Sequence, residues 1–278
     1  MLTLTPQGNL AAYARYLHQF PDDLAQFVPA LGETPVLGSI MADSLTQVAG
    51  NPPRKQALAE IRDRCLFNAP VTKEACVAVA RLMVPNWKAQ LVTVAAVRMA
   101  LEAAGLVCWL LKPGLSAEQR VARYVASADS ESKQGSAFIS LAIRNASHLK
   151  DELVAVGTRS IRPTRDARDE LKAGGITPTA MPEPGALAAH VADEAVYRAF
   201  SSAVHGSAAG IKEFSELLLG PKKRHGFFLL LIELTGRAHA IVAIRIHEYV
   251  RGPMSSDFRT RLDSCAVKLG TDPSRLNP

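Results

Sequence analysis

The stretch Ala89-Gln-Leu-Val-Thr-Val-Ala-Ala-Val-Arg98-Met-Ala-Leu-Glu102-Ala-Ala-Gly-Leu-Val-Cys-Trp-Leu-Leu111 sets the fold class of this chain. It is rich in Ala and Leu, and Pro113-Gly114 follows it, so we expect one long helix over about 87–111. Its length would span a bilayer, but Arg98 and Glu102 stand near its middle. We therefore interpret it as a central helix of an all-α bundle, and we expect no membrane span.

Helical periodicity also recurs outside this stretch, with no convincing strand alternation and no repeat of fixed period. Pro and Gly residues divide the chain into roughly ten helices. Pro52-Pro53 and Pro85 are the natural boundaries, so we expect an N-terminal helical layer (1–85) and a main bundle (86–278), with a single domain as the alternative. The further helices are expected over 8–20, 37–49, 54–67, 72–84, 116–130, 136–157, 163–173, 186–205, 207–219, 227–250 and 255–269.

The composition limits which class of protein this can be, but it does not identify a function. The 278 residues are 48% hydrophobic, which is enough for a sizeable core. The net charge of +6 permits a polyanionic partner, but a solvated basic surface explains it equally well. The N-terminus has no signal-peptide pattern. Because the four cysteines are scattered, we expect them to be reduced and the protein to be cytoplasmic; they are Cys65, Cys76, Cys108 and Cys265.

Sequence motifs for cofactors and metals are absent. The chain has no GxGxxG or GxxxxGK[ST] phosphate loop and no HExxH, and it lacks the Glu-x-x-His pair of di-iron bundles. No convincing helix-turn-helix pattern appears either. We therefore expect no cofactor, no metal site and no sequence-specific reading of DNA.

A polar stripe stands out in Tyr197-Arg-Ala-Phe-Ser-Ser-Ala-Val-His205. Arg198, Ser201, Ser202 and His205 recur at i, i+3, i+4 and i+7, which places them on one face of the expected helix. A guanidinium can hold a phosphate and an imidazole can move a proton near neutral pH, while the two hydroxyls orient them. With a ribose 2′-hydroxyl as nucleophile, such a site needs no metal. The alternative is a structural network within the core, in which Arg198 reaches Glu102.

Charged residues elsewhere leave similar alternatives open. Arg98 and Glu102 are expected to form an i, i+4 pair, and Glu102 could also bridge to Arg120 or Arg123 on the following helix. The same spacing predicts a second pair in the 227–250 helix, between Glu233 and Arg237. These groups indicate either internal ion pairs or a small-ligand pocket lined by Glu102, Arg123 and Arg198. A row of arginines is expected to be a salt-bridged surface; it comprises Arg159, Arg162, Arg165 and Arg168.

Arg198, six intervening residues and His205, on a helix of an all-α protein, resemble the R-x(4–6)-H signature of HEPN-type proteins. The resemblance implies a helical bundle, a homodimer that brings two motifs together, and metal-independent RNA cleavage in toxin or phage-defence systems. Arg198 would be the phosphate clamp and His205 the general acid and base. The chain departs from that pattern at Ala199, where the family usually has Asn, Asp or His.

A second resemblance covers about half the chain. The pattern from Arg98 to Gly206 looks like one found in uncharacterised helical proteins of actinobacteria, and it implies no known activity. We therefore expect a HEPN-like cytoplasmic protein that binds or cleaves RNA. The alternative is a non-enzymatic helical interaction protein whose polar stripe is structural.

Overall fold

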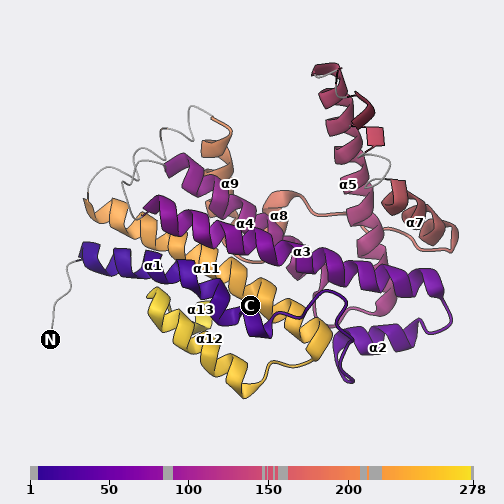
Figure 1. Cartoon of the computed structure of the whole chain (residues 1–278), viewed down its shortest axis with the longest axis horizontal. Coiled ribbons are helices and arrows are strands. Elements are labelled where there is room, and N and C mark those ends of the chain that lie inside the picture. The colour runs from indigo at the N-terminus through magenta and orange to yellow at the C-terminus, as the bar shows by residue number, and fades with distance from the viewer. Residues whose placement is uncertain are drawn as a thin grey trace. The chain divides into compact units, whose positions relative to one another are not determined.

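The computed structural model describes residues 6–83, 90–145, 148, 150–152, 154–155, 162–206, 212 and 221–276. Every regular element in these ranges is a helix, so the predicted all-α, multi-helix fold is confirmed (Figure 1). The helix predicted over 207–219 lies outside these residues except for Lys212, and so does the predicted boundary at residue 85.

The chain divides into two compact units, each built from separate stretches of sequence. The first comprises 1–40, 62–111 and 182–278, and the second comprises 41–61 and 112–181. The helix α3 (Pro52–Met83) contributes to both units.

The first unit is organised around two long apolar helices, α4 (Gln90–Leu110) and α11 (Pro221–Arg251). The helix α11 packs against α4 on one side and against α1 (Pro6–Leu24) on another, and α12 (Ser256–Leu269) packs on α1 (Figure 1). The core residues of α11 are fully buried; they include Ala240, Ile241, Val242 and Ala243. A 3₁₀ turn (Ala25–Phe27) follows α1, and the short α13 (Pro273–Leu276) ends the described chain.

Both long helices are apolar enough, over a sufficient length, to cross a membrane. The stretches concerned are 91–110 and 224–251, and 56% and 78% of their most apolar 18-residue windows are buried inside the structure. The core helix of a soluble protein passes the same test, so this finding is weak evidence. That the chain does not span a membrane stays a prediction.

The prediction of two helices over 54–67 and from 72 onward is wrong, because α3 runs through Pro70 without a break. Proline removes one backbone N–H from the helix ladder. Polar side chains on either side of Pro70 bind carbonyls of the preceding turns: Asn68 Nδ2 donates to the carbonyl of Arg64 at 2.8 Å, and Thr72 Oγ1 lies 3.1 Å from that of Ala69. These local contacts accompany an unbroken helix, so the proline does not mark its end.

Two other predicted breaks are also absent. The break expected between the helices over 116–130 and 136–157 is absent, because α5 (Ala117–Asn145) covers the first range and continues into the second. Gly135 lies inside it, and a glycine costs a helix only about 1 kcal/mol. The chain between the helices expected over 207–219 and 227–250 is helical from Pro221 onward, because α11 begins there; Pro221 is tolerated because the first helical N–H groups have no partner within the helix.

The helix predicted over 186–205 is instead divided in two, α8 (Pro184–Ala188) and α9 (Glu194–Val204). Asp193 begins α9: its side chain accepts a hydrogen bond from the backbone N–H of Ala195 at 2.7 Å. His205 caps the other end, and Gly206 follows with a positive φ of 71°. The polar stripe therefore lies on a short helix that ends at the histidine.

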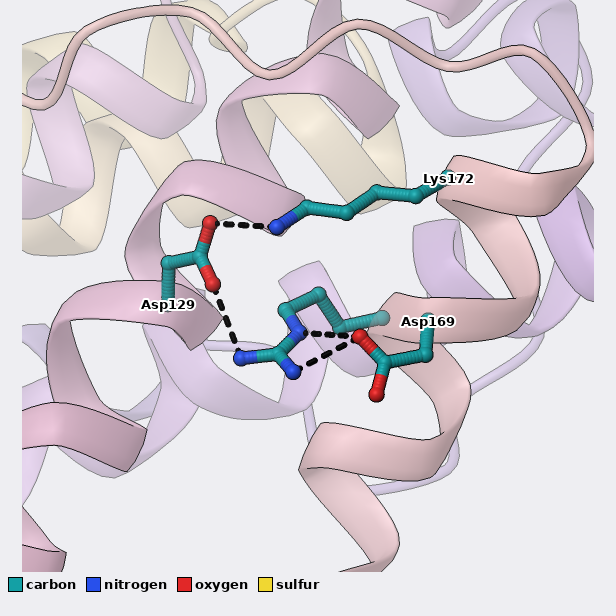
Figure 2. A network of polar contacts seen from close by, with 4 residues as sticks. Asp129, Asp169 and Lys172 are labelled. Atoms are coloured by element: carbon teal, nitrogen blue, oxygen red, sulfur yellow. Dashed lines mark hydrogen bonds and ion pairs between the residues drawn. The ribbon is translucent and has the colours of Figure 1, made fainter.

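In the second unit, α7 (Arg162–Ala173) packs against α5, and α2 (Ile40–Gln47) begins the unit. Figure 2 shows Asp129 of α5 between two cations of α7. One carboxylate oxygen accepts from Arg168 and the other from Lys172, both at 2.8 Å, and Arg168 also binds Asp169. The salt-bridged interpretation of the arginine row is confirmed at Arg168, while Arg159 and the side chains of Arg162 and Arg165 lie outside the described residues.

Asp129→Asn is expected to loosen α7. The change removes the negative charge that two cations share, and a hydrogen bond to a charged group contributes on the order of 1 kcal/mol in a partly exposed position. Hydrogen exchange should show faster amide exchange in α7, with little change in α11. Glu170→Gln, which changes an exposed carboxylate on α7 itself, is the control. Equal exchange in the two variants would contradict a role for the Asp129 contacts.

All four cysteines are free and buried. Burial raises the pKa of three of the thiols, Cys76, Cys108 and Cys265, because a thiolate is poorly solvated inside the protein. These thiols are therefore held in the unreactive, protonated form.

Candidate functional site

The exposed end of α9 brings His205 to the side of α4. The imidazole Nε2 of His205 lies 2.9 Å from Nη1 of Arg98, although the two residues are 107 positions apart in the sequence. The contact follows from the way α9 packs. Its apolar residues Tyr197, Phe200 and Ala203 are buried, and α9 lies against α4, so the end of the helix reaches Arg98.

Arg98 is held in place by two further residues. Its Nε donates to Oε1 of Glu102 at 2.8 Å, which confirms the predicted i, i+4 pair. The hydroxyl of Tyr197 donates to the same oxygen at 2.6 Å, and its ring centre is 5.7 Å from the guanidinium carbon. We call these four residues, Arg98, Glu102, Tyr197 and His205, the Arg98–His205 cluster.

Electrostatics keep this arginine charged. Burial opposes the charged form of Arg98, whose side chain is 19% exposed, but hydrogen bonding with Tyr197 and Glu102 raises the pKa of the guanidinium above its ordinary value. Burial and the hydrogen bond to Glu102 raise the pKa of the Tyr197 phenol. The cluster therefore holds a charged guanidinium and a protonated phenol beside the side chain of Glu102 and the solvent-exposed imidazole of His205.

The predicted contact between Arg198 and Glu102 does not form, and the Arg–His–Glu network contains Arg98 in its place. The side chain of Arg198 is 75% exposed, and its Nη2 binds Oε1 of Glu194 on the preceding turn at 2.7 Å. Glu102 binds Arg98 and Tyr197 instead. Because the apolar residues occupy the opposite face of α9, the polar stripe faces outward.

The other predicted site residues are distributed more widely. Ser201 and Ser202 are half-buried on α9, and the carbonyl of Ser201 accepts the backbone N–H of His205 at 3.0 Å. Arg123 belongs to α5 in the second unit, where burial lowers the pKa of its guanidinium. The binding roles of these three residues stay predictions. The predicted pairing of Glu233 with Arg237 is wrong, since Glu233 binds Arg275 at 3.0 Å.

Sequence reasoning missed Tyr197 and placed Arg98 outside the catalytic pair. The signal for Arg98 was present: a charged pair inside the most apolar helix needs a partner or a function. The signal for Tyr197 was weaker, because a tyrosine next to an arginine is common on any amphipathic helix. Nothing in the spacing along the chain connects either residue to His205.

A small pocket in the second unit is a weaker candidate for a site. It is lined by Gln56, Glu60, Tyr124 and Glu170, among others. Both oxygens of Glu60 already accept hydrogen bonds, one from Gln56 Nε2 at 3.0 Å and one from the Tyr124 hydroxyl. The carboxylate is thus satisfied within the protein, which favours a structural role.

Within the ranges that the structure describes, no three His, Cys, Asp or Glu side chains are grouped so that they could hold a metal ion. No protein-family model, curated protein or solved structure matches this chain. The chemistry of the Arg98–His205 cluster is therefore the feature that bears on function.

Proposed function

We propose that this protein binds RNA at the exposed end of α9 and cleaves it without a metal ion, as the resemblance to HEPN-type proteins implies. The observation that carries the proposal is the contact between an exposed imidazole and a fixed guanidinium, 2.9 Å apart. An imidazole and a guanidinium at this separation can act on the same phosphodiester. The resemblance assigns the phosphate clamp to Arg198, which is also exposed on α9.

The proposed reaction uses the RNA's own nucleophile. Nε2 of His205 takes the proton of a ribose 2′-hydroxyl, and O2′ attacks the adjacent phosphorus. The O2′–P bond forms and the P–O5′ bond breaks, which gives a 2′,3′-cyclic phosphate. O5′ takes a proton from water, and His205 later releases its proton to solvent. The guanidinium of the arginine that clamps the phosphate stabilises the charge that develops on the phosphate oxygens. Ser201 and Ser202 would orient the phosphate or the imidazole.

His205→Ala is the direct test. Purified wild-type protein is incubated with single-stranded RNA in EDTA, and the 2′,3′-cyclic phosphate product is measured. We expect the variant to be slower by roughly 100-fold or more, because general acid and base catalysis contributes about that factor. His18→Ala changes an exposed histidine of α1 and should retain full activity. Equal cleavage by wild type and His205→Ala, or no cleavage by either, would refute the catalytic proposal.

The same resemblance leads us to propose a cytoplasmic homodimer that acts in a toxin or defence system. A dimer would bring two copies of His205 together. The mass of the purified protein in light scattering tests this, and a monomer at all concentrations would refute it.

A non-enzymatic interaction protein is the second candidate, and the loop over 28–39 favours it. Leu31, Val36 and Leu37 on this loop are 64%, 49% and 95% exposed. The loop is nevertheless fixed, since Glu33 binds Arg251 through both carboxylate oxygens at 2.6 and 2.9 Å. Rigid, exposed apolar side chains are typical of a protein-binding surface. Absence of cleavage in EDTA would favour this candidate.

A further inference from the structure

We propose that Arg98, and not Arg198, is the cation that binds the phosphate next to His205. This inference rests on the proposed function and corrects the residue that the HEPN resemblance assigns to the phosphate. It would make Arg98 a substrate-binding residue, with Glu102 and Tyr197 as the positioning residues that hold it.

The two arginines are held differently. Nε of Arg98 is bound to Glu102, and its Nη1 is directed to His205 at the solvent-exposed end of α9. In Arg198, both Nε and Nη2 are bound to the same oxygen of Glu194, at 3.1 and 2.7 Å. A phosphate would have to break that ion pair to use the same edge of Arg198. It would find Arg98 already oriented toward the imidazole, which lowers the entropy lost on binding.

The contact with Arg98 also determines which nitrogen of His205 carries the proton. A guanidinium has five N–H donors and no acceptor, so Nε2 of His205 must accept the hydrogen bond from Arg98. The imidazole in this contact is therefore neutral, with its proton on Nδ1. This is the state in which Nε2 acts as a general base.

An arriving phosphate changes this contact. Phosphate oxygens accept hydrogen bonds strongly from guanidinium groups, so they compete with His205 for Nη1 of Arg98. When the phosphate takes that N–H, the lone pair of Nε2 is released beside the bound phosphate. Binding through Arg98 thus frees the base at the place where the 2′-hydroxyl lies. Arg198 makes no such contact with His205 in this structure, because its guanidinium lies on Glu194.

The test is a titration with inorganic phosphate at constant ionic strength, followed by the nitrogen and carbon-bound proton NMR signals of the His205 ring at pH 7.5. In the free wild-type protein, Nε2 should show the shift of an unprotonated acceptor. Phosphate should move the His205 signals in a saturable way. Arg98→Gln should weaken phosphate binding by at least tenfold, whereas Arg198→Gln should leave the affinity within about twofold.

Glu194→Gln provides a second, independent variant on the exposed face of α9. It releases Arg198 from its ion pair, so the affinity for phosphate should rise severalfold if Arg198 is the clamp and should stay unchanged if Arg98 is. Should Arg98→Gln fail to fold, the Arg198→Gln and Glu194→Gln titrations still decide between the two arginines. Loss of binding in Arg198→Gln, or no response of His205 to phosphate in the wild type, would overturn the proposal.

These results separate the inference from the proposed function. Phosphate binding that depends on Arg98, without RNA cleavage in EDTA, would support the anion site and refute the nuclease. Cleavage that depends on His205, with phosphate binding that depends on Arg198, would support the nuclease and refute the role of Arg98.

Discussion

Gly105→Ala should lower the free energy of unfolding by about 3 kcal/mol, since one methyl group at this position has no room. Gly105 lies on α4 where α8 crosses it. A Cβ there would collide with the backbone carbonyl of Leu187 and would stand 3.0 Å from the backbone nitrogen of Ala188. A side chain could rotate away from the methyl group, but a backbone carbonyl cannot. The change therefore pushes α8 off α4, which outweighs the gain of about 1 kcal/mol in helix propensity.

Urea-induced unfolding measures this effect, and Gly226→Ala is the matched control. Gly226 also lies within a helix, α11, but a Cβ added there would meet nothing within 4 Å. That variant should be unchanged or more stable by up to about 1 kcal/mol. Because α8 leads into α9, Gly105→Ala should also disturb the ring signals of His205. If the two variants had equal stability, the close approach of α8 to α4 would be contradicted.

Acid should destabilise the protein through His239, a buried histidine of α11. Its side chain is 3% exposed, Nδ1 lies 2.9 Å from Oγ1 of Thr72, and the Phe20 ring packs against its edge with ring centres 5.8 Å apart. Burial, with a smaller effect from Lys73, lowers the pKa of His239 from 6.5 to about 4, while Asp22 acts in the opposite direction. The folded protein therefore keeps this imidazole neutral.

The sign of the pH dependence follows from the lowered pKa. As pH falls below 6.5, the unfolded chain takes up a proton on His239 that the folded protein refuses until about pH 4. The stabilisation is complete above pH 6.5 and is lost between 6.5 and 4, by about 3 kcal/mol in total. Unfolding by urea at pH 7.5 and pH 4.5 measures the loss. In His239→Leu the difference between the two pH values should shrink by about 2–3 kcal/mol; an unchanged difference would contradict this account.

Several helices were predictable because their residues are locally consistent. The expected ranges 87–111, 227–250 and 255–269 correspond to α4, α11 and α12. In each case an apolar run ends at a glycine or proline signal, and Ser255 caps α12 by accepting from the N–H of Phe258. The Arg98–Glu102 pair was predictable for the same reason, since i, i+4 neighbours on a helix meet whatever the rest of the chain does.

The errors arise where contacts distant in sequence, or single capping groups, decide the outcome. Pro70 looks like a helix end, yet α3 continues through it. Residues 189–193 carry no proline or glycine, yet Asp193 starts a new helix there. That second error matters for function. The stripe lies on the short α9, where Arg198 is exposed and His205 stands at the C-terminal end beside α4.

The partner of His205 was not predictable from periodicity at all. The R-x(6)-H spacing points to Arg198 on the same helix, while the contact observed is with Arg98 on another helix. Periodicity describes faces of single helices, and a contact between two helices depends on how they cross. The apolar face of α9 shows which side of the helix is packed. Only the packing against α4 determines which residue His205 contacts.

The four buried cysteines make the folded protein resistant to thiol-directed chemistry. A thiol reagent needs an exposed thiolate, and burial denies it both exposure and, at Cys76, Cys108 and Cys265, ionisation. The four thiols lie on α3, α4 and α12, all within the first unit. The order in which they become modified would therefore report which of these helices opens first, with no label or substitution introduced into the chain.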